Sequence, residues 1–205
     1  MKKICILDYG LGNVRSLYNS LKKLNFSPVL FSENIKNNYD FVFIPGVGSF
    51  SAASKILNTR KYLDFLQTHR KSGKKIFGIC LGMQILHSFG EENGACNGLN
   101  YINGKVTKIE SKNKKILPLV GYQKVRFLDN INLPFLKEYN LEKFYFVHSY
   151  VVSLSSEKNL LALTYSDDYE YPAAVIDHNI IGTQFHPEKS GEVGLNFLKD
   201  IINKY

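Results

Sequence analysis

The chain has 205 residues and a mass of 23.4 kDa, which is enough for one domain with a well-buried core. Hydrophobic residues make up 44% and charged residues 21%, which excludes a disordered chain, and no apolar run approaches the roughly 20 residues that cross a bilayer. The net charge of +8 permits nucleic-acid binding by a basic cluster of lysines. These lysines have no interleaved aromatic residues, which favours a docking face for an acidic partner instead.

The first half of the chain alternates apolar strands with amphipathic helices. The strands are expected at residues 3–8, 29–31, 41–44 and 75–79, and their continuous apolar runs are typical of a buried parallel sheet. The helices are expected at residues 14–24, through residues 56–66 as far as Gly73, and from Cys80 to Gly90. This alternation predicts a doubly wound α/β domain.

Closely spaced strands follow from about residue 100. They are expected to be antiparallel and partly exposed, at residues 105–109, 124–127, 143–147 and 160–165. Residues 173–177 and 181–185 flank a predicted tight turn at His178 and Asn179, and a helix with apolar residues from Val193 to Ile202 ends the chain. No repeat or linker interrupts the sequence, so residues 1–205 are predicted to form a single domain.

Cysteine usage and the N-terminus indicate a soluble cytoplasmic protein. The first apolar run ends at Asp8 after four residues, which favours a buried strand over a signal peptide. Three cysteines do not make a disulfide framework, so a reducing compartment is expected. Cys5 is expected in the core and Cys96 at the surface.

The lysines considered above for nucleic-acid binding form the basic cluster. They are Lys71, Lys74, Lys75, Lys112, Lys114 and Lys115.

Cys80 has the sequence context of a nucleophile. It lies between Gly78 and Gly82 at a predicted strand-to-helix junction, as in a nucleophile elbow with sulfur in place of oxygen. A sharp turn brings neighbouring backbone so close that a Cβ on either side would clash, which accounts for the two glycines. The helix N-terminus that follows stabilises a thiolate.

Five histidines are candidates for the base that would act on Cys80. His69 and His178 are expected to be solvated, and His87 is expected two helical turns beyond the cysteine, too far from its sulfur. His148 is a rival because it ends a predicted strand, where the sites of α/β folds lie. His186 is favoured, because Pro187 keeps it out of a helix and Glu188 would lie on the same side of an extended chain, where it can orient the imidazole.

Two motifs together resemble the class I, or triad, glutamine amidotransferases. They are Gly-Ile-Cys-Leu-Gly-Met-Gln at residues 78–84 and Gln-Phe-His-Pro-Glu at residues 184–188. The resemblance implies a flavodoxin-like domain in which Cys80 is the nucleophile, His186 the base and Glu188 its orienter. It also assigns Gln84, one helical turn beyond Cys80, to recognition of glutamine.

Three further segments resemble the family of glutaminase subunits of imidazole glycerol phosphate synthases. They read Asp-Tyr-Gly-Leu-Gly-Asn-Val-Arg-Ser at residues 8–16, Pro-Gly-Val-Gly-Ser-Phe at residues 45–50 and His-Ser-Tyr at residues 148–150. In that family the turn at residues 45–48 is the oxyanion strand. The resemblance therefore implies that glutamine binds at Gly46, Gly48, Gln84, Ser149 and Tyr150.

One segment departs from the family. The family usually has Pro-His-Met-Gly-Trp-Asn where residues 118–123 read Pro-Leu-Val-Gly-Tyr-Gln, and the chain contains no tryptophan. Because this segment faces the synthase partner in the family, a second acceptor stays open. Related glutaminase subunits feed ammonia to enzymes that amidate cell-surface sugars.

The expected reaction is hydrolysis of L-glutamine to glutamate and ammonia. The Cys80 thiolate attacks the carboxamide, and His186 protonates the departing ammonia and then activates water against the γ-glutamyl thioester. The oxyanion needs two N–H donors, which are expected from Leu81 and from either Val47 or Gly48. No metal or organic cofactor is required.

The glutaminase domain occupies the whole chain, which implies a separate synthase subunit in a heterodimer that channels ammonia across its interface. Phosphorylated substrates are expected to belong to that partner. Two other hypotheses remain. The first is a cysteine peptidase or other thiol hydrolase built on the same elbow, and the second is a non-catalytic binding subunit of the same fold.

Overall fold

A nine-stranded sheet forms the centre of the computed structural model, which describes residues 2–31, 38–110, 117–129, 132–166 and 169–205. One half of the sheet is parallel and contains, in spatial order, β2 (Val29–Leu30), β1 (Ile4–Ile6), β3 (Phe41–Gly46), β4 (Lys75–Cys80) and β13 (Ile180–Thr183). The other half is antiparallel and continues with β12 (Tyr169–Asp177), β11 (Leu160–Ser166), β8 (Leu119–Phe127) and β9 (Lys143–His148). The predicted α/β architecture, a parallel core with an added antiparallel region, is therefore confirmed.

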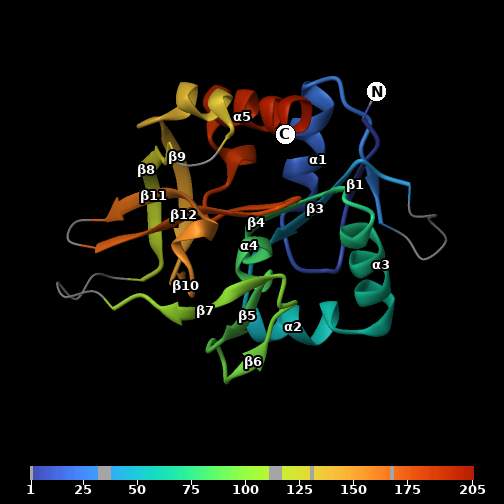
Figure 1. The fold of residues 1–205 in the computed structure, drawn as a ribbon, viewed down its shortest axis with the longest axis vertical. Helices are drawn as coiled ribbons and strands as arrows, with labels where there is room; N and C mark the ends of the chain where they lie inside the picture. The colour runs from blue at the N-terminus through green and yellow to red at the C-terminus, as the bar shows by residue number, and fades with distance from the viewer. Residues whose placement is uncertain (1, 32–37, 111–116, 130–131, 167–168) are drawn as a thin grey trace.

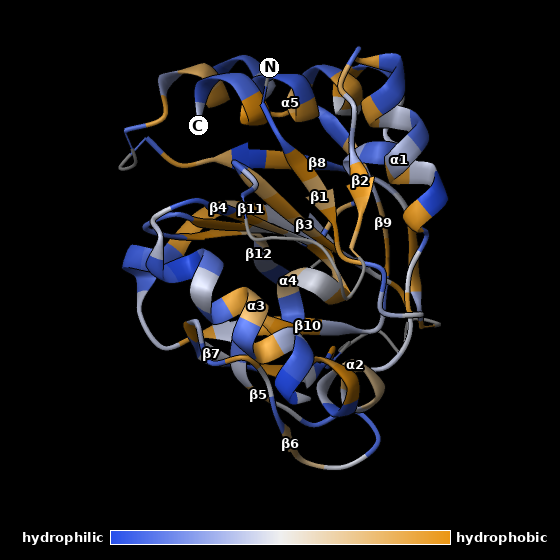
Figure 2. Ribbon diagram, turned by 90° about the vertical axis from the view of Figure 1, so that its right-hand side faces the viewer, coloured by the Kyte–Doolittle hydropathy of each residue, from blue (hydrophilic) through white to orange (hydrophobic). Residues whose placement is uncertain are grey.

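Helices cover both faces of this sheet (Figure 1). Helices α1 (Val14–Lys23) and α5 (Gly191–Lys204) lie on one face, and α2 (Phe50–Leu57), α3 (Arg60–Lys71) and α4 (Leu81–Ile85) lie on the other. Apolar and polar residues alternate along the helices in Figure 2, and the buried apolar ones, such as Leu17 and Leu21 of α1 and Phe197 and Ile201 of α5, belong to the core. Two hydrophobic clusters result, one on each face of the sheet.

A second, four-stranded sheet lies beyond α4. Its order is β10 (Tyr150–Leu154), β7 (Ile102–Lys108), β5 (His87–Gly90) and β6 (Cys96–Asn97). Strand β5 runs parallel to β7, and the other two pairings are antiparallel. Because β10 follows β9 after a single residue, this arrangement brings Ser149 to the boundary between the two sheets.

Two helix predictions were wrong. The helix expected as far as Gly73 is two helices, because Asn58 ends α2 and Thr59 begins α3. The helix expected from Cys80 to Gly90 ends at Ile85, and His87 begins β5. The His87 Nδ1 lies 3.0 Å from the carbonyl oxygen of Met83, so this side chain occupies the helix end and the chain leaves it as a strand.

The predicted hairpin and the predicted C-terminal helix are present in the structure. The hairpin between β12 and β13 turns at His178 and Asn179, and α5 spans the predicted C-terminal helix. None of the helices formed by the described residues has the length and apolar character that crossing a membrane requires. Lys112, Lys114 and Lys115 of the basic cluster lie outside the described residues.

Candidate active site

Cys80 lies at the junction between β4 and α4, in the strained conformation of an elbow. Its backbone φ is +54°, a region that non-glycine residues rarely adopt and that costs on the order of 1–3 kcal/mol. A Cβ on Gly78 would lie 2.5 Å from the carbonyl oxygen of Gly82, and a Cβ on Gly82 would overlap the carbonyl oxygen of Ile44. The sharp turn therefore requires both glycines, as the sequence predicts.

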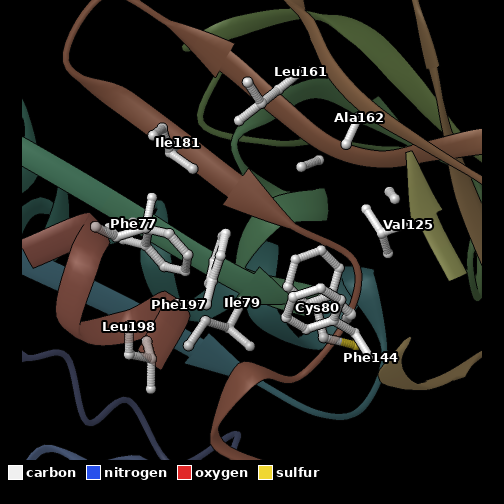
Figure 3. Close-up of a cluster of buried hydrophobic side chains, with 14 of the residues drawn as sticks. Phe77, Ile79, Cys80, Val125, Phe144, Leu161, Ala162, Ile181, Phe197 and Leu198 are labelled. Atoms are coloured by element: carbon white, nitrogen blue, oxygen red, sulfur yellow. The ribbon is translucent and has the colours of Figure 1, made fainter. Parts of the chain in front are cut away.

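The Cys80 thiol lies between the hydrophobic core and a polar surface. Figure 3 shows its side chain among the buried apolar residues of one cluster, together with Ile79 and Phe144. The sulfur accepts a hydrogen bond of 3.6 Å from Gln184 Nε2 and approaches the carbonyl oxygen of Val147 at 3.8 Å. Only 5% of the residue is exposed, and Cys80 lines a pocket.

His186 and Glu188 form a buried pair next to Cys80. Their Nδ1 and Oε1 atoms lie 2.8 Å apart, and the side chains are 2% and 3% exposed. His186 follows β13 in extended conformation, its N–H bonded to the carbonyl oxygen of Tyr145, whereas a 3-10 turn, η3 (Pro187–Lys189), begins at the next residue. The predicted contact between His186 and Glu188 is therefore present, but a turn that starts at Pro187 produces it, where the sequence predicted an extended chain.

The charges around His186 favour its protonated form. Burial opposes a charged imidazole, but the negative charges of Cys80 and Glu188 outweigh it and raise the pKa of His186 to about 10. Within the described part of the chain, Nε2 of this ring has no hydrogen-bond partner. The arrangement suits an imidazolium that stabilises a thiolate and holds one ring atom ready for proton transfer.

A pocket of about 330 Å³ opens over Cys80, near the small end of the range for small-molecule sites. Its walls come from five separate segments of the chain. The lining residues are Val47, Gly48, Ser49, Cys80, Leu81, Gln84, Glu92, Pro118, Val147, His148, Ser149 and Tyr150. The pocket therefore contains every residue that the sequence assigned to oxyanion or glutamine binding except Gly46, which lies buried behind it.

Gln84 is held so that one atom remains available to a ligand. Its Nε2 donates hydrogen bonds of 3.0 Å to the carbonyl oxygen of Tyr150 and to Gln184 Oε1, which uses both amide protons. Its Oε1 has no partner among the described residues and can accept a hydrogen bond from a ligand. The sequence identified Gln184 only as part of the motif at residues 184–188 and gave it no role. In the structure, Gln184 connects the Gln84 amide to the Cys80 sulfur.

Both ring nitrogens of His148, the rival base, are hydrogen-bonded to groups other than the thiol. Its Nδ1 lies 3.0 Å from the carbonyl oxygen of Tyr150, and its Nε2 lies 3.2 Å from the Tyr171 hydroxyl. Burial lowers its pKa to about 4. Tyr171 in turn donates a 2.7 Å hydrogen bond to Gln123, one of the residues at which the chain departs from the family, so this departure has a buried structural role.

The remaining histidines and cysteines divide between expected and unexpected positions. His178 is exposed and Cys5 is buried, as predicted. His69 is not solvated but 2% exposed, because its ring is hydrogen-bonded to the carbonyl oxygen of Lys75 at 3.0 Å. Cys96 is half-buried rather than at the surface, since it packs against the second hydrophobic cluster.

Glu92 is a pocket residue that the sequence did not indicate. Its Oε2 accepts a 2.8 Å hydrogen bond from the N–H of Phe50, the first residue of α2. It supplies the one carboxylate among the residues that line the pocket. No local pattern distinguishes it from its exposed neighbour Glu91, because only the packing of β5 and β6 beneath α2 brings it to the site.

A metal centre has no basis in the described ranges, where no group of three or more His, Cys, Asp and Glu side chains is arranged to hold an ion. The polar groups at the pocket are instead a thiol, amides, hydroxyls, one carboxylate and backbone N–H groups. This set fits covalent catalysis on a small polar substrate.

Comparison with known proteins agrees with this geometry. Residues 5–204 match the family "Glutamine amidotransferase class-I". The chain is 41% identical over 196 residues to imidazole glycerol phosphate synthase subunit HisH of Sulfolobus acidocaldarius, covering 96% of this chain and 95% of that protein. It is 37% identical over 205 residues to the HisH subunit of Methanosarcina barkeri, covering 99% of each.

Solved structures share the fold at lower identity. A chain of the PurLQS structure from Thermotoga maritima has a TM-score of 0.75 and 21% identity, with 99% of each chain covered. A structure described as a glutamine amidotransferase has a TM-score of 0.74 and 16% identity, with 97% of each chain covered.

Proposed function

The chain belongs to the class I glutamine amidotransferase family, and we infer from this membership and from its HisH relatives that it is the glutaminase subunit of imidazole glycerol phosphate synthase, in histidine biosynthesis. The observation that carries the chemistry is the position of Cys80. Its thiol lies at a strained elbow at the floor of a pocket, beside the buried pair of His186 and Glu188.

The catalytic roles follow from this arrangement. Glutamine enters the pocket with its side-chain carboxamide next to Cys80, and the thiolate attacks the amide carbon to form a tetrahedral adduct. His186, positively charged because of its neighbours, gives its proton to the departing ammonia and leaves a γ-glutamyl thioester. The neutral ring then takes a proton from water, which attacks the thioester and releases glutamate, while Glu188 keeps Nδ1 protonated throughout.

Backbone N–H groups would stabilise the oxyanion of the adduct. Leu81 provides one at the N-terminus of α4, directly after the nucleophile, where the N–H groups of the first turn have no intrahelical acceptor. The second comes from the turn at Val47 and Gly48, which also lines the pocket. A hydrogen bond at such a position is worth roughly 3 kcal/mol in the transition state.

The rest of the pocket supplies recognition of the amino acid. The Glu92 carboxylate suits the α-ammonium group, because a charge-assisted hydrogen bond is about twice as strong as a neutral one. Gln84 offers its free Oε1 as an acceptor, and Ser149 and Tyr150 form the adjoining part of the wall. These groups leave the carboxamide end of the substrate directed at Cys80.

The ammonia produced here would pass to a synthase subunit in a heterodimer, across a face formed by β8. This strand begins directly after the pocket residue Pro118 and presents two exposed apolar side chains, Val120 at 61% and Tyr122 at 57% exposure. Tyr122 also donates a 3.1 Å hydrogen bond to the carbonyl oxygen of Lys189, directly after Glu188. A partner that covers this strand would cover the site and keep ammonia from solvent.

The experiment that tests this function adds candidate synthase subunits to the protein and measures glutamate released from glutamine. The imidazole glycerol phosphate cyclase subunit is expected to stimulate release and to form a complex in gel filtration. If it has no effect and a sugar-amidating synthetase stimulates release instead, the subunit belongs to that second type of partner. The departure at residues 118–123 makes this the informative alternative.

A further inference from the structure

A loop that follows β1 packs tightly against the turn at the pocket mouth. A Cβ built on Gly12 would lie 3.2 Å from the Cα of Gly46, so these two backbone segments are in direct contact. A Cβ built on Gly46 would lie 2.5 Å from the hydroxyl oxygen of Tyr9 and 2.8 Å from the Cβ of Leu81. The Tyr9 hydroxyl therefore fills the position where Gly46 lacks a side chain, immediately behind the turn that lines the pocket.

This hydroxyl is buried and has no partner among the described residues. Tyr9 is 4% exposed and belongs to the hydrophobic cluster that also contains Leu81. Burial and the nearby charge of Cys80 both raise its pKa, so the group is a neutral O–H donor. Buried hydroxyls in folded proteins nearly always have a hydrogen-bond partner, and one without a partner requires an explanation.

We propose that Tyr9 is a positioning residue for the oxyanion hole, whose hydroxyl donates a hydrogen bond to the carbonyl oxygen of Gly46 when the Gly46–Val47 peptide turns to direct the Val47 N–H at the substrate oxyanion. The inference rests on the proposed glutaminase function and deepens it. It also selects Val47 over Gly48 as the second donor, because Tyr9 contacts the residue directly before Val47.

The geometry of the peptide group supplies the reason. The C=O and N–H of a trans peptide point in opposite directions, so turning the Val47 N–H toward the pocket turns the Gly46 carbonyl toward the interior. A carbonyl turned into an apolar interior needs a donor. Tyr9 provides an unused one at that place, while Gly46 and Gly48, the latter at a φ of +116°, leave the turn free to rotate.

The test compares Tyr9→Phe with wild type in complex with the stimulating synthase subunit. This substitution removes one oxygen atom and keeps the ring. We expect kcat for glutamine hydrolysis to fall about 10- to 100-fold, the loss that an unsatisfied buried carbonyl causes, with KM for glutamine unchanged. Alkylation of Cys80 by iodoacetamide forms no oxyanion, so its rate is expected to remain at the wild-type value.

Tyr101→Phe is the matched control. Tyr101 is 6% exposed, lies in the same cluster and has a buried hydroxyl without a hydrogen-bond partner in the described residues, but it is not among the nearest neighbours of Gly46 or Gly48. Its removal is expected to leave kcat unchanged. The inference is overturned if Tyr9→Phe retains the wild-type kcat, or if alkylation and hydrolysis fall by the same factor. If wild type releases no glutamate, the proposed function fails and the inference with it.

Discussion

His186 donates a hydrogen bond of 2.8 Å to Glu188, and both side chains are almost entirely enclosed by protein. In water such a pair contributes little, but burial strengthens the interaction because water cannot screen it. The pair fixes one ring nitrogen and leaves Nε2 free of other partners in the described part of the chain. In the proposed mechanism, proton transfer at Cys80 depends on this orientation.

Glu188→Gln is expected to reduce kcat at least 100-fold, because the amide neither holds the correct tautomer nor stabilises the imidazolium. The carboxylate raises the pKa of His186, so its removal lowers that pKa. The alkaline limb of kcat/KM, which the pKa of about 10 predicts near pH 10 in wild type, should then move to lower pH. The exposed Glu192 provides the control, Glu192→Gln, with a wild-type profile. An unchanged limb in Glu188→Gln would contradict the role given to this carboxylate.

Glu92→Gln is expected to raise KM for glutamine at least tenfold with little change in kcat, because it removes the negative charge that we propose binds the ammonium group. The Gln side chain introduced at position 92 can still accept the hydrogen bond from the N–H of Phe50, which preserves the start of α2. Glu91→Gln, at the exposed neighbouring position, should have no effect. Steady-state kinetics of wild type and the two variants measure these KM values. Equal KM values for wild type and Glu92→Gln would contradict a role of Glu92 in binding glutamine.

Buried histidines should make the fold sensitive to acid. Burial lowers the pKa of His87 to about 4, below its ordinary value of 6.5. Between these two values the unfolded chain takes up a proton that the folded chain does not, so the free energy of unfolding falls as the pH drops through this window. His87 alone should contribute a loss on the order of 3 kcal/mol. Denaturant unfolding should show a smaller pH dependence in His87→Gln than in wild type, and identical slopes would contradict this.

Gly82→Ala should abolish the elbow. The added Cβ would overlap the carbonyl oxygen of Ile44, which belongs to β3 and cannot move without disturbing the sheet. We expect the variant to lose more than about 3 kcal/mol of stability or to fail to fold. Gly94→Ala, at a positive φ but with open space around it, should lose only about 1 kcal/mol. Thermal unfolding of both variants measures the difference, and comparable losses would mean that the tight approach to Ile44 is unimportant.

Local signals in the sequence were sufficient to predict the elbow at Cys80 and the contact between His186 and Glu188. The glycines around Cys80 and the His-Pro-Glu run encode their geometry within a few residues, and the alternation of strands and helices gave the α/β class. The end of α4 could not be predicted this way, because it depends on the side chain of His87 and on pairing between β5 and β7. His69 was misplaced for the same kind of reason, since its partner Lys75 begins the next strand.

The pocket itself required the three-dimensional structure. Glu92 and the hydrogen-bonded set that contains Tyr171 and Gln123 come from elements that tertiary packing alone brings together. The second sheet, which sets Tyr150 opposite Gln84, was also beyond the sequence, because two of its strands are shorter than five residues and lack clear alternation.

The most direct test of Cys80 as the nucleophile is glutamate release from glutamine by Cys80→Ala, measured in complex with the stimulating synthase subunit. Loss of the nucleophile should lower the rate at least about 10⁴-fold while the complex still forms, and Cys96→Ala should remain as active as wild type. Glutamate release by Cys80→Ala at a rate near that of wild type would contradict the assignment of Cys80 as the nucleophile.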